Sequence, residues 1–192
     1  MAKKRLEVNE YLDSESWFNY KSFYDFIGLK EFDMLVEVGV WKGHSISYLA
    51  EQNPNSKIYA VDLFDETYRY KKDKLKKQVP FIYEIYNLNL HRFNVRDRIT
   101  DIKGFSWESA SKFENGEIDF VYIDADHRYR SVKKDLDAWF PKIKAGGIFA
   151  GHDYEPYANQ SHPGVKKAVD EFAVKNNLEV QQFDGCVWYI EK

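Results

Sequence analysis

Three ionisable residues follow directly after a short apolar run in the second half of the chain. Residues 120–123, Phe-Val-Tyr-Ile, are followed by Asp124, Asp126 and His127. An imidazole with an ordinary pKa of about 6.5 can accept a proton at neutral pH. We therefore expect Asp124 and His127 to be catalytic residues, with His127 as the general base, while the role of Asp126 stays open. The alternative is a structural His127 that pairs with Asp126 or Asp153.

A second polar group follows the next apolar run. His152 and Asp153 lie in the segment "GGIFAGHDY", and we count Asp153 among the catalytic residues. Two carboxylates and an imidazole can bind Mg²⁺ or another divalent cation, with Asp124, His152 and Asp153 as ligands. The alternative is a metal-free cluster that holds two loops together by hydrogen bonds, and the sequence leaves both interpretations open.

A glycine-containing turn separates the first apolar run from the helical segment that follows it. In "VEVGVWKGHSISYLAE", Gly39 allows a sharp turn and Gly43 allows close packing of helix against strand. Trp41 takes the place of the middle glycine of the dinucleotide fingerprint, which leaves less room for a pyrophosphate. We therefore expect a nucleotide-like ligand without a pyrophosphate. The cofactor-binding residues of this segment are predicted to be Glu37, Gly39, Trp41, Gly43 and Ser45.

Further cofactor residues are expected after the second and third strands. Asp62 lies 23 residues beyond Gly39, where an acidic side chain can accept both ribose hydroxyls. Ser106 and its aromatic neighbours can lie beside an adenine ring, although Ser106 can equally be a helix N-cap. Together these features predict an adenosine-containing cofactor. Its remaining ligands are predicted to be Asp62, Leu63, Ser106, Trp107 and Asp124.

The elements that position these residues alternate between strand and helix. Strands are predicted at 34–39, 57–64, 98–104, 118–124, 147–153, 178–183 and 186–190. Helices are predicted at 16–28, 45–52, 66–93, 106–113, 131–143 and 162–176. Five alternations predict a parallel sheet covered on both faces, and the Asp-Gly turn between the last two strands predicts an antiparallel hairpin. Ligands of such sheets bind at the carboxyl ends of the strands, where the polar groups above are expected.

Other titratable residues give weaker signals. His44 adjoins the glycine turn and can contact the cofactor, whereas His91 and His162 show no pattern beyond their local context. Asp135 and Asp137 are expected to be solvated residues of the 131–143 helix. The single cysteine, Cys186, excludes an intramolecular disulfide and is expected to be a small buried residue of a strand.

Composition places the chain among ordinary globular proteins, and we expect one domain over 1–192. The net charge of −3 gives no overall attraction to nucleic acid or to an anionic membrane. One basic run at 71–77 is interpreted as a solvated helix face. The N-terminus lacks the apolar core of a secretory signal, and no stretch approaches the roughly 18 apolar residues of a membrane span. A cytoplasmic location is therefore expected.

Four motifs in order resemble the class I S-adenosylmethionine-dependent methyltransferases: "LVEVGVWKGHSISYLA", "IYAVDLF", "IDADHRY" and "GGIFAGHDY". The nearest match is the bacterial small-molecule O-methyltransferase-like group that carries I-D-A-D-H-x-Y followed by G-H-D-Y. The resemblance covers residues 16–175. It implies a Rossmann-like α/β/α sandwich with a seven-stranded, mostly parallel sheet and an antiparallel C-terminal strand, and S-adenosyl-L-methionine as cofactor.

The resemblance also implies a mechanism. The cation-dependent catechol and caffeoyl-coenzyme-A O-methyltransferases are similar at greater distance, with a metal-binding Asp at Asp124 and an Asp-Asn pair replaced by His152-Asp153. Their catalytic Lys falls at His127. These matches imply attack of an acceptor hydroxyl on the cofactor's methyl group. His127 would take the proton, and a cation on Asp124 and Asp153 would lower the pKa of the hydroxyl.

The acceptor is expected to be a small hydroxylated molecule, of sugar or aromatic natural-product type. An N-terminal helical cap (1–33), the helical segment 64–93 and the loop 154–162 are expected on the substrate side. Aromatic side chains there can stack on the acceptor or pack against a second copy in a homodimer. Alternatives are an RNA methyltransferase that uses the basic run at 71–77, a nicotinamide-dependent oxidoreductase, and a non-catalytic protein that keeps the cofactor fold.

Overall fold

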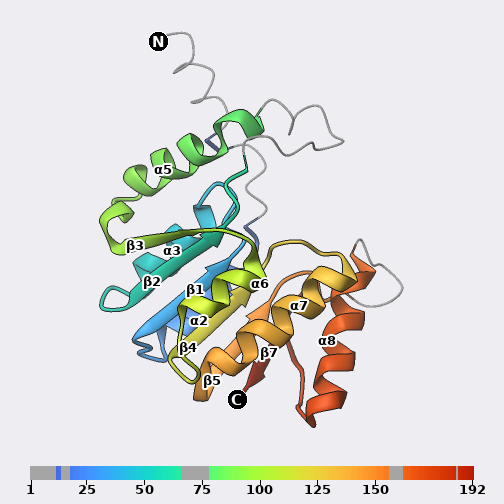
Figure 1. The fold of residues 1–192 in the computed structure, drawn as a ribbon. Helices are drawn as coiled ribbons and strands as arrows, with labels where there is room; N and C mark the ends of the chain where they lie inside the picture. Colours follow the sequence, from blue (N-terminus) through green and yellow to red (C-terminus); the bar gives the residue numbers. More distant parts are fainter. Residues whose placement is uncertain (1–11, 14–17, 66–77, 156–161, 185) are drawn as a thin grey trace.

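A seven-stranded sheet forms the centre of the computed structural model, which describes residues 12–13, 18–65, 78–155, 162–184 and 186–192 (Figure 1). The strand order is β3-β2-β1-β4-β5-β7-β6. The strands are β1 (Met34–Val38), β2 (Lys57–Asp62), β3 (Ile99–Lys103), β4 (Ile118–Ile123), β5 (Ile143–Gly151), β6 (Gln181–Phe183) and β7 (Val187–Glu191).

The first five strands are parallel, and β7 runs antiparallel to both β5 and β6. The register brings the strand ends level, because Val38 aligns with Ile123 and Ile123 aligns with Gly151. The residues that follow β1, β4 and β5 therefore meet at one edge of the sheet. The expected fold class, a mostly parallel sheet with an antiparallel C-terminal hairpin, is confirmed.

Helices cover both faces of the sheet and form three layers (Figure 1). One face is covered by α2 (Lys21–Gly28), α3 (His44–Gln52) and α5 (Ile82–Arg92). The other is covered by α6 (Ser106–Ser109), α7 (Tyr129–Trp139) and α8 (Pro163–Asn176). Short 3-10 turns are η1 (Val79–Phe81), η2 (Arg96–Arg98), η3 (Ala110–Lys112) and η4 (Phe140–Lys142).

Two hydrophobic cores result from the alternation of side chains along the strands. In β4, Phe120 and Tyr122 pack toward α2 and α3, whereas Val121 and Ile123 pack toward α7 and α8. All four side chains are buried. Burial of each large apolar side chain contributes about 1.5–3 kcal/mol, so these cores hold the strand ends in place.

Element boundaries differ from the sequence-based expectation at a few places. β5 begins at Ile143, before its Gly-Gly pair, and β6 is limited to Gln181–Phe183. The helix expected at 131–143 begins at Tyr129 and ends at Trp139, because Pro141 lies in the 3-10 turn that follows. Of the helix expected at 66–93, α5 is present, while 66–77, with its basic run, lies outside the described residues.

The expectation that Asp135 is solvated is wrong. Asp135 is fully buried on α7, whose inward face also carries Ser131, Val132, Leu136 and Trp139. These positions recur at intervals of three and four, so the helix period places Asp135 on the same face as the apolar residues.

Among the residues that the structure describes, no helix has the length and apolar character needed to cross a membrane.

Candidate active site

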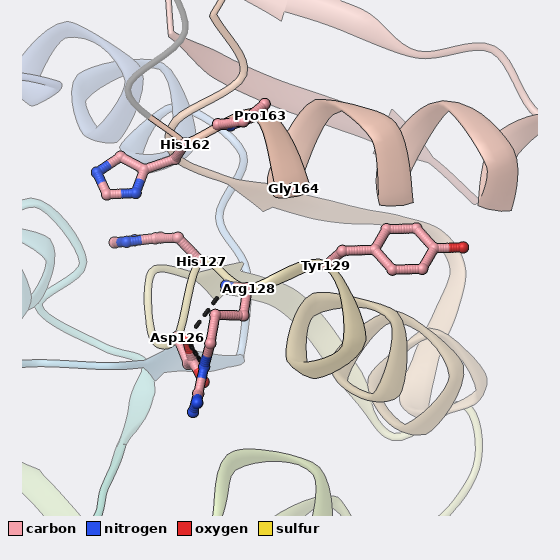
Figure 2. Close-up of a pocket in the computed structure, with 7 residues that line it drawn as sticks. All are labelled: Asp126, His127, Arg128, Tyr129, His162, Pro163 and Gly164. Atoms are coloured by element: carbon pink, nitrogen blue, oxygen red, sulfur yellow. Dashed lines mark hydrogen bonds and ion pairs between the residues drawn. The ribbon is translucent and has the colours of Figure 1, made fainter.

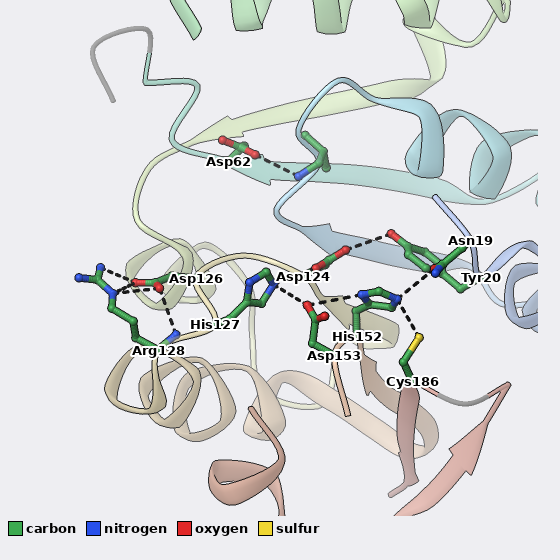
Figure 3. A network of polar contacts seen from close by, with 11 residues as sticks. Asn19, Tyr20, Asp62, Asp124, Asp126, His127, Arg128, His152, Asp153 and Cys186 are labelled. Carbon is green, nitrogen blue, oxygen red and sulfur yellow. Dashed lines mark hydrogen bonds and ion pairs between the residues drawn. The ribbon is translucent and has the colours of Figure 1, made fainter. Parts of the chain in front are cut away.

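Asp124 follows β4 and contacts two side chains at the edge of the sheet (Figure 3). One carboxylate oxygen, Oδ1, lies 3.2 Å from Nε2 of His127, on the loop that leads into α7. The other, Oδ2, accepts a hydrogen bond from the hydroxyl of Tyr20 at 3.3 Å. The expected pairing of Asp124 with His127 is therefore present, and Tyr20 adds a buried donor from the segment before α2.

Asp153 brings a second carboxylate to the same imidazole. Nε2 of His127 lies 2.9 Å from Asp153 Oδ2, and Nδ1 of His152 lies 3.5 Å from that oxygen. The backbone of Asp153 is left-handed, with φ of 59°, a conformation that few non-glycine residues adopt. His127 is thus held between two carboxylates that follow adjacent strands (Figure 3).

These contacts change the protonation of the cluster. Burial disfavours the imidazolium of His127, but the hydrogen bonds and charges of Asp124 and Asp153 outweigh burial and raise its pKa to about 10. In this arrangement the two carboxylates therefore favour the protonated imidazole of His127. Burial opposes ionisation of Asp153 as well, yet His127 and His152 hold the pKa of Asp153 well below its usual range.

His152 connects the cluster to the C-terminal hairpin. Its Nε2 lies 3.1 Å from Oδ1 of Asn19 and 3.2 Å from Sγ of Cys186, which directly precedes β7 (Figure 3). The expectation that Cys186 is a buried strand residue is wrong, because the thiol is half-buried and faces His152. Burial and nearby carboxylates, Asp153 among them, raise the pKa of the Cys186 thiol, so it stays neutral.

In the glycine turn after β1, Gly39 makes the close backbone approach expected of it, whereas Gly43 packs against α5 and not against a strand. A Cβ on Gly39, whose φ is 90°, would lie 2.2 Å from the carbonyl oxygen of Asp124. A Cβ on Gly43, at φ of 79°, would lie 2.9 Å from the ring of Tyr86. Trp41 between them also has positive φ, 48°. Both glycine positions therefore exclude other residues, and the turn is held against the end of β4.

Asp62 fixes the conformation of this turn. Its Oδ2 accepts hydrogen bonds from the backbone N–H groups of Val40 at 3.0 Å and Trp41 at 3.2 Å. Its Oδ1 accepts one from Phe64 at 2.9 Å. Burial raises the pKa of Asp62, and the backbone donors partly offset this. Asp62 therefore lies where a ribose contact is expected, and it anchors two loops there.

Glu37 and Ser45, both predicted cofactor ligands, lie beneath the turn. Glu37 is fully buried; it accepts hydrogen bonds from the hydroxyl of Tyr24 at 2.9 Å and from Ser45 Oγ. Burial raises the pKa of Glu37 to about 8, against the effect of these two donors. Glu37 therefore links β1 to α2 through Tyr24 and to α3 through Ser45.

The residues after β2 and β3 offer an apolar surface. Leu63 and Phe105 are among the exposed large hydrophobic side chains of the described residues. Phe105 and Trp107 stack with their ring centroids 5.2 Å apart and an interplanar angle of 14°. Exposed apolar side chains at successive strand ends are what an adenine ring would cover, so these residues fit an adenosine-containing cofactor.

Ser106 and Asp126 have local structural partners. Ser106 Oγ donates to the buried Asp135, and neither it nor Phe105 makes a side-chain cap of α6. Asp126 accepts hydrogen bonds from Ser131 Oγ at 2.8 Å and from Arg128, whose guanidinium also pairs with it. Asp126, whose role the sequence left open, therefore fastens the start of α7.

A hollow lies beside His127, and the sequence patterns did not indicate its second histidine. The rings of His127 and His162 have centroids 4.3 Å apart (Figure 2). The hollow has a volume of about 520 Å³ and is lined by Asp126, His127, Arg128, Tyr129, His162, Pro163 and Gly164. His162 directly precedes α8, 35 residues after His127, so only the tertiary packing brings the two together.

Two sets of side chains have the donor atoms to hold a divalent cation. Asp124, His152 and Asp153, the ligands expected from the sequence, each place a donor atom within 4.8 Å of the others. His127, Asp153 and His162 do the same. The first set offers two carboxylates and one imidazole, and these donors fit a divalent cation.

Comparison with known proteins agrees with the fold. A family model described as a methyltransferase domain matches residues 36–154. The "Uncharacterized protein R132" of Acanthamoeba polyphaga mimivirus is 28% identical over 141 residues, which cover 70% of this chain and 58% of that protein. The chain thus spans less than two thirds of the length of this relative.

Solved structures show the same fold at low sequence identity. The O-methyltransferase NovP is 21% identical, with a TM-score of 0.65 over 91% of this chain and 78% of its own. The O-methyltransferase from Bacillus cereus, solved in complex with SAH, is 15% identical, with a TM-score of 0.68 over 98% of this chain and 88% of its own.

Proposed function

The chain belongs to the family of methyltransferase domains, and from this premise we propose that it transfers a methyl group from S-adenosyl-L-methionine to a hydroxyl oxygen of a small acceptor. The observation that carries the proposal is the position of His127 between Asp124 and Asp153, at strand ends that adjoin the Gly39 turn. These contacts support a role for His127 in proton transfer beside the loop expected to hold the methyl donor.

The cofactor would lie along the carboxyl ends of β1, β2 and β3. The turn at Gly39 and Trp41 would face it with backbone groups, Asp62 would accept its ribose hydroxyls, and Leu63 and Phe105 would cover its adenine. The bound cofactor supplies an electrophilic methyl group. Glu37, which is buried beneath the turn, would keep this loop in the conformation that binds the cofactor.

The acceptor hydroxyl must lose its proton, and we assign this task to His127. In the arrangement described here His127 already carries a proton, so it can act as a base only after its carboxylate partners are engaged elsewhere. Asp124, His152 and Asp153 would hold a divalent cation, which would supply positive charge to polarise the hydroxyl. The open hollow beside His127 leaves room for a small acceptor, for which we propose a sugar or an aromatic natural product.

Cofactor binding can be tested without knowledge of the acceptor. Thermal unfolding is measured with S-adenosylhomocysteine and, separately, with NAD. A ligand at one hundred times its Kd stabilises the native state by about 2.7 kcal/mol, so S-adenosylhomocysteine should raise the Tm and NAD should not. A shift with NAD alone would overturn the proposal in favour of an oxidoreductase.

The role of His127 is tested by turnover of labelled S-adenosyl-L-methionine against a panel of phenols, catechols and sugars, with and without Mg²⁺. His127→Ala should lower turnover by about 10²–10⁴-fold, the usual contribution of a general base, and leave the Kd for S-adenosylhomocysteine unchanged. The matched control is His91→Ala, because His91 is an exposed residue of α5. Full turnover by His127→Ala would remove His127 from the mechanism.

A further inference from the structure

Three of the five histidines of the chain surround one carboxylate. His127 and His152 lie 2.9 and 3.5 Å from Oδ2 of Asp153, and His162 joins them in the second set of potential metal ligands. His162 comes from a different element, the segment that starts α8. Imidazoles gathered around one carboxylate from separate parts of the chain are typical of metal sites.

The backbone is built to bring His162 against His127. A Cβ on Gly164 would lie 2.7 Å from the carbonyl oxygen of His127 and 2.6 Å from the backbone nitrogen of Tyr129. Only glycine therefore allows the first turn of α8 to approach the start of α7 so closely. Pro163 occupies the first position of α8, where its fixed φ sets the direction in which the chain leaves His162.

The spacing of His127 and Asp153 suits a shared metal ion. Two ligands that each bind an ion at about 2.1 Å lie about 3.0 Å apart when they meet at a right angle, and about 3.4 Å apart in a tetrahedron. The observed separation of Nε2 and Oδ2 is 2.9 Å. A donor atom of His162 lies within 4.8 Å of both, so a side-chain rotation at the wall of the hollow can complete the set.

We propose that His127, Asp153 and His162 form a binding site for a borderline transition-metal ion of the Zn²⁺, Co²⁺ or Ni²⁺ class. Two imidazoles and one carboxylate favour such ions over Mg²⁺, which prefers oxygen ligands. The hollow shown in Figure 2 opens over both imidazoles and provides the entry path that an exchangeable ion needs.

This site differs from the one formed by Asp124, His152 and Asp153. The two sets share Asp153, so the first is distinguished by His127 and His162 and the second by Asp124 and His152. The inference rests on the placement of these side chains and does not depend on methyl transfer. One consequence is that His127 cannot serve as a base while it ligates an ion.

Binding of Co²⁺ to the full chain tests the site, because its visible absorption reports the number and type of ligands. The protein is first dialysed against a chelator, and Co²⁺ is then titrated into the wild type and three variants, His162→Asn, His152→Asn and His91→Asn. Asparagine is chosen because it is favoured at the N-cap position, which His162 holds in α8. Circular dichroism confirms that each variant is folded.

We expect His162→Asn to weaken Co²⁺ binding at least tenfold and to change the absorption band, and to do so more than His152→Asn. His91→Asn should match the wild type. The proposal is overturned if the wild type binds no Co²⁺ at millimolar concentration, or if His162→Asn binds as the wild type does. A greater loss in His152→Asn than in His162→Asn overturns it too, because the ion would then lie on the Asp124 set.

Discussion

Asp135 lies buried between α6 and α7, and we expect its replacement by asparagine to stabilise the protein above neutral pH. Its Oδ1 accepts a hydrogen bond from Ser106, while Oδ2 is buried with no partner among the described residues. Burial raises the pKa of Asp135 from 3.8 to about 7, helped by the charge of Asp126 and opposed by the Ser106 hydroxyl. The native protein therefore holds this carboxyl as a neutral acid over most of the acidic range.

The magnitude follows from the difference between the two states. Each unit of pKa difference is worth about 1.4 kcal/mol, so a rise of about three units corresponds to about 4 kcal/mol. Because the native pKa is above the unfolded one, the native state binds the extra proton. The contribution of Asp135 to the free energy of unfolding is thus full below about pH 4 and is lost as the pH rises through 7.

The assay is urea unfolding of wild type and Asp135→Asn at a series of pH values from 4 to 8. Asparagine keeps an oxygen for the Ser106 hydroxyl but carries no charge at any pH. The free-energy difference between variant and wild type should move in favour of the variant by about 4 kcal/mol across this range. The matched control is Asp137→Asn, which makes the same exchange at an exposed position two residues along the same helix.

A difference for Asp135→Asn that stays flat within about 1 kcal/mol would refute the reasoning, since one pKa unit already amounts to about 1.4 kcal/mol. It would mean that the native protein keeps Asp135 ionised at the same pH as the unfolded chain. An equal offset at every pH, added to this pH-dependent change, would not count against the reasoning, because it reflects the exchange of a hydroxyl for an amide.

Three further substitutions test the turn after β1. Gly39→Ala should lower the free energy of unfolding in urea by more than about 3 kcal/mol, because the new methyl group meets a backbone oxygen at 2.2 Å. The control is Gly116→Ala, which also has positive φ but no atom within 4 Å of the new methyl group. It should lower the free energy of unfolding by only about 1–2 kcal/mol. Tyr24→Phe removes a donor to the buried Glu37 and should cost about 1–3 kcal/mol by the same measurement; no loss would show that Glu37 is satisfied otherwise. Asp62→Ala should lower the Tm and weaken S-adenosylhomocysteine binding in calorimetry; unchanged values for both would refute its role as anchor and as ligand.

The order of the elements and the edge that carries the site could be predicted, because they follow from local patterns. Alternating apolar runs indicated the strands, and the rule that ligands bind at carboxyl ends located Asp124 and Asp153 correctly relative to each other. A sequence motif consists of residues that are close in the chain, so the sequence analysis missed His162. Its approach to His127 depends on Gly164, which lies 37 residues beyond His127.

Protonation states and buried polar groups were harder to predict for a physical reason. The pKa of His127 depends on the distances to two carboxylates, one of them on another strand, and those distances exist only in the folded chain. Asp135 was expected to be solvated because aspartate usually is, although its position relative to Leu136 and Trp139 places it on the buried face. Helix period therefore predicted its burial better than residue type did.

The strand ends of this site hold bulky residues in a conformation that they adopt only under constraint. Trp41 and Phe64 have positive φ, which costs a non-glycine residue about 1 kcal/mol or more, and both donate their N–H groups to the carboxylate of Asp62. A fall in cofactor affinity after Asp62→Ala can therefore come from release of this strain as well as from loss of a ribose contact. Trp41→Gly relieves the strain without Asp62, so the double variant separates the two. If the double variant binds the cofactor more weakly than Trp41→Gly alone, the carboxylate contacts the cofactor; if the two bind alike, Asp62 acts through the loop alone.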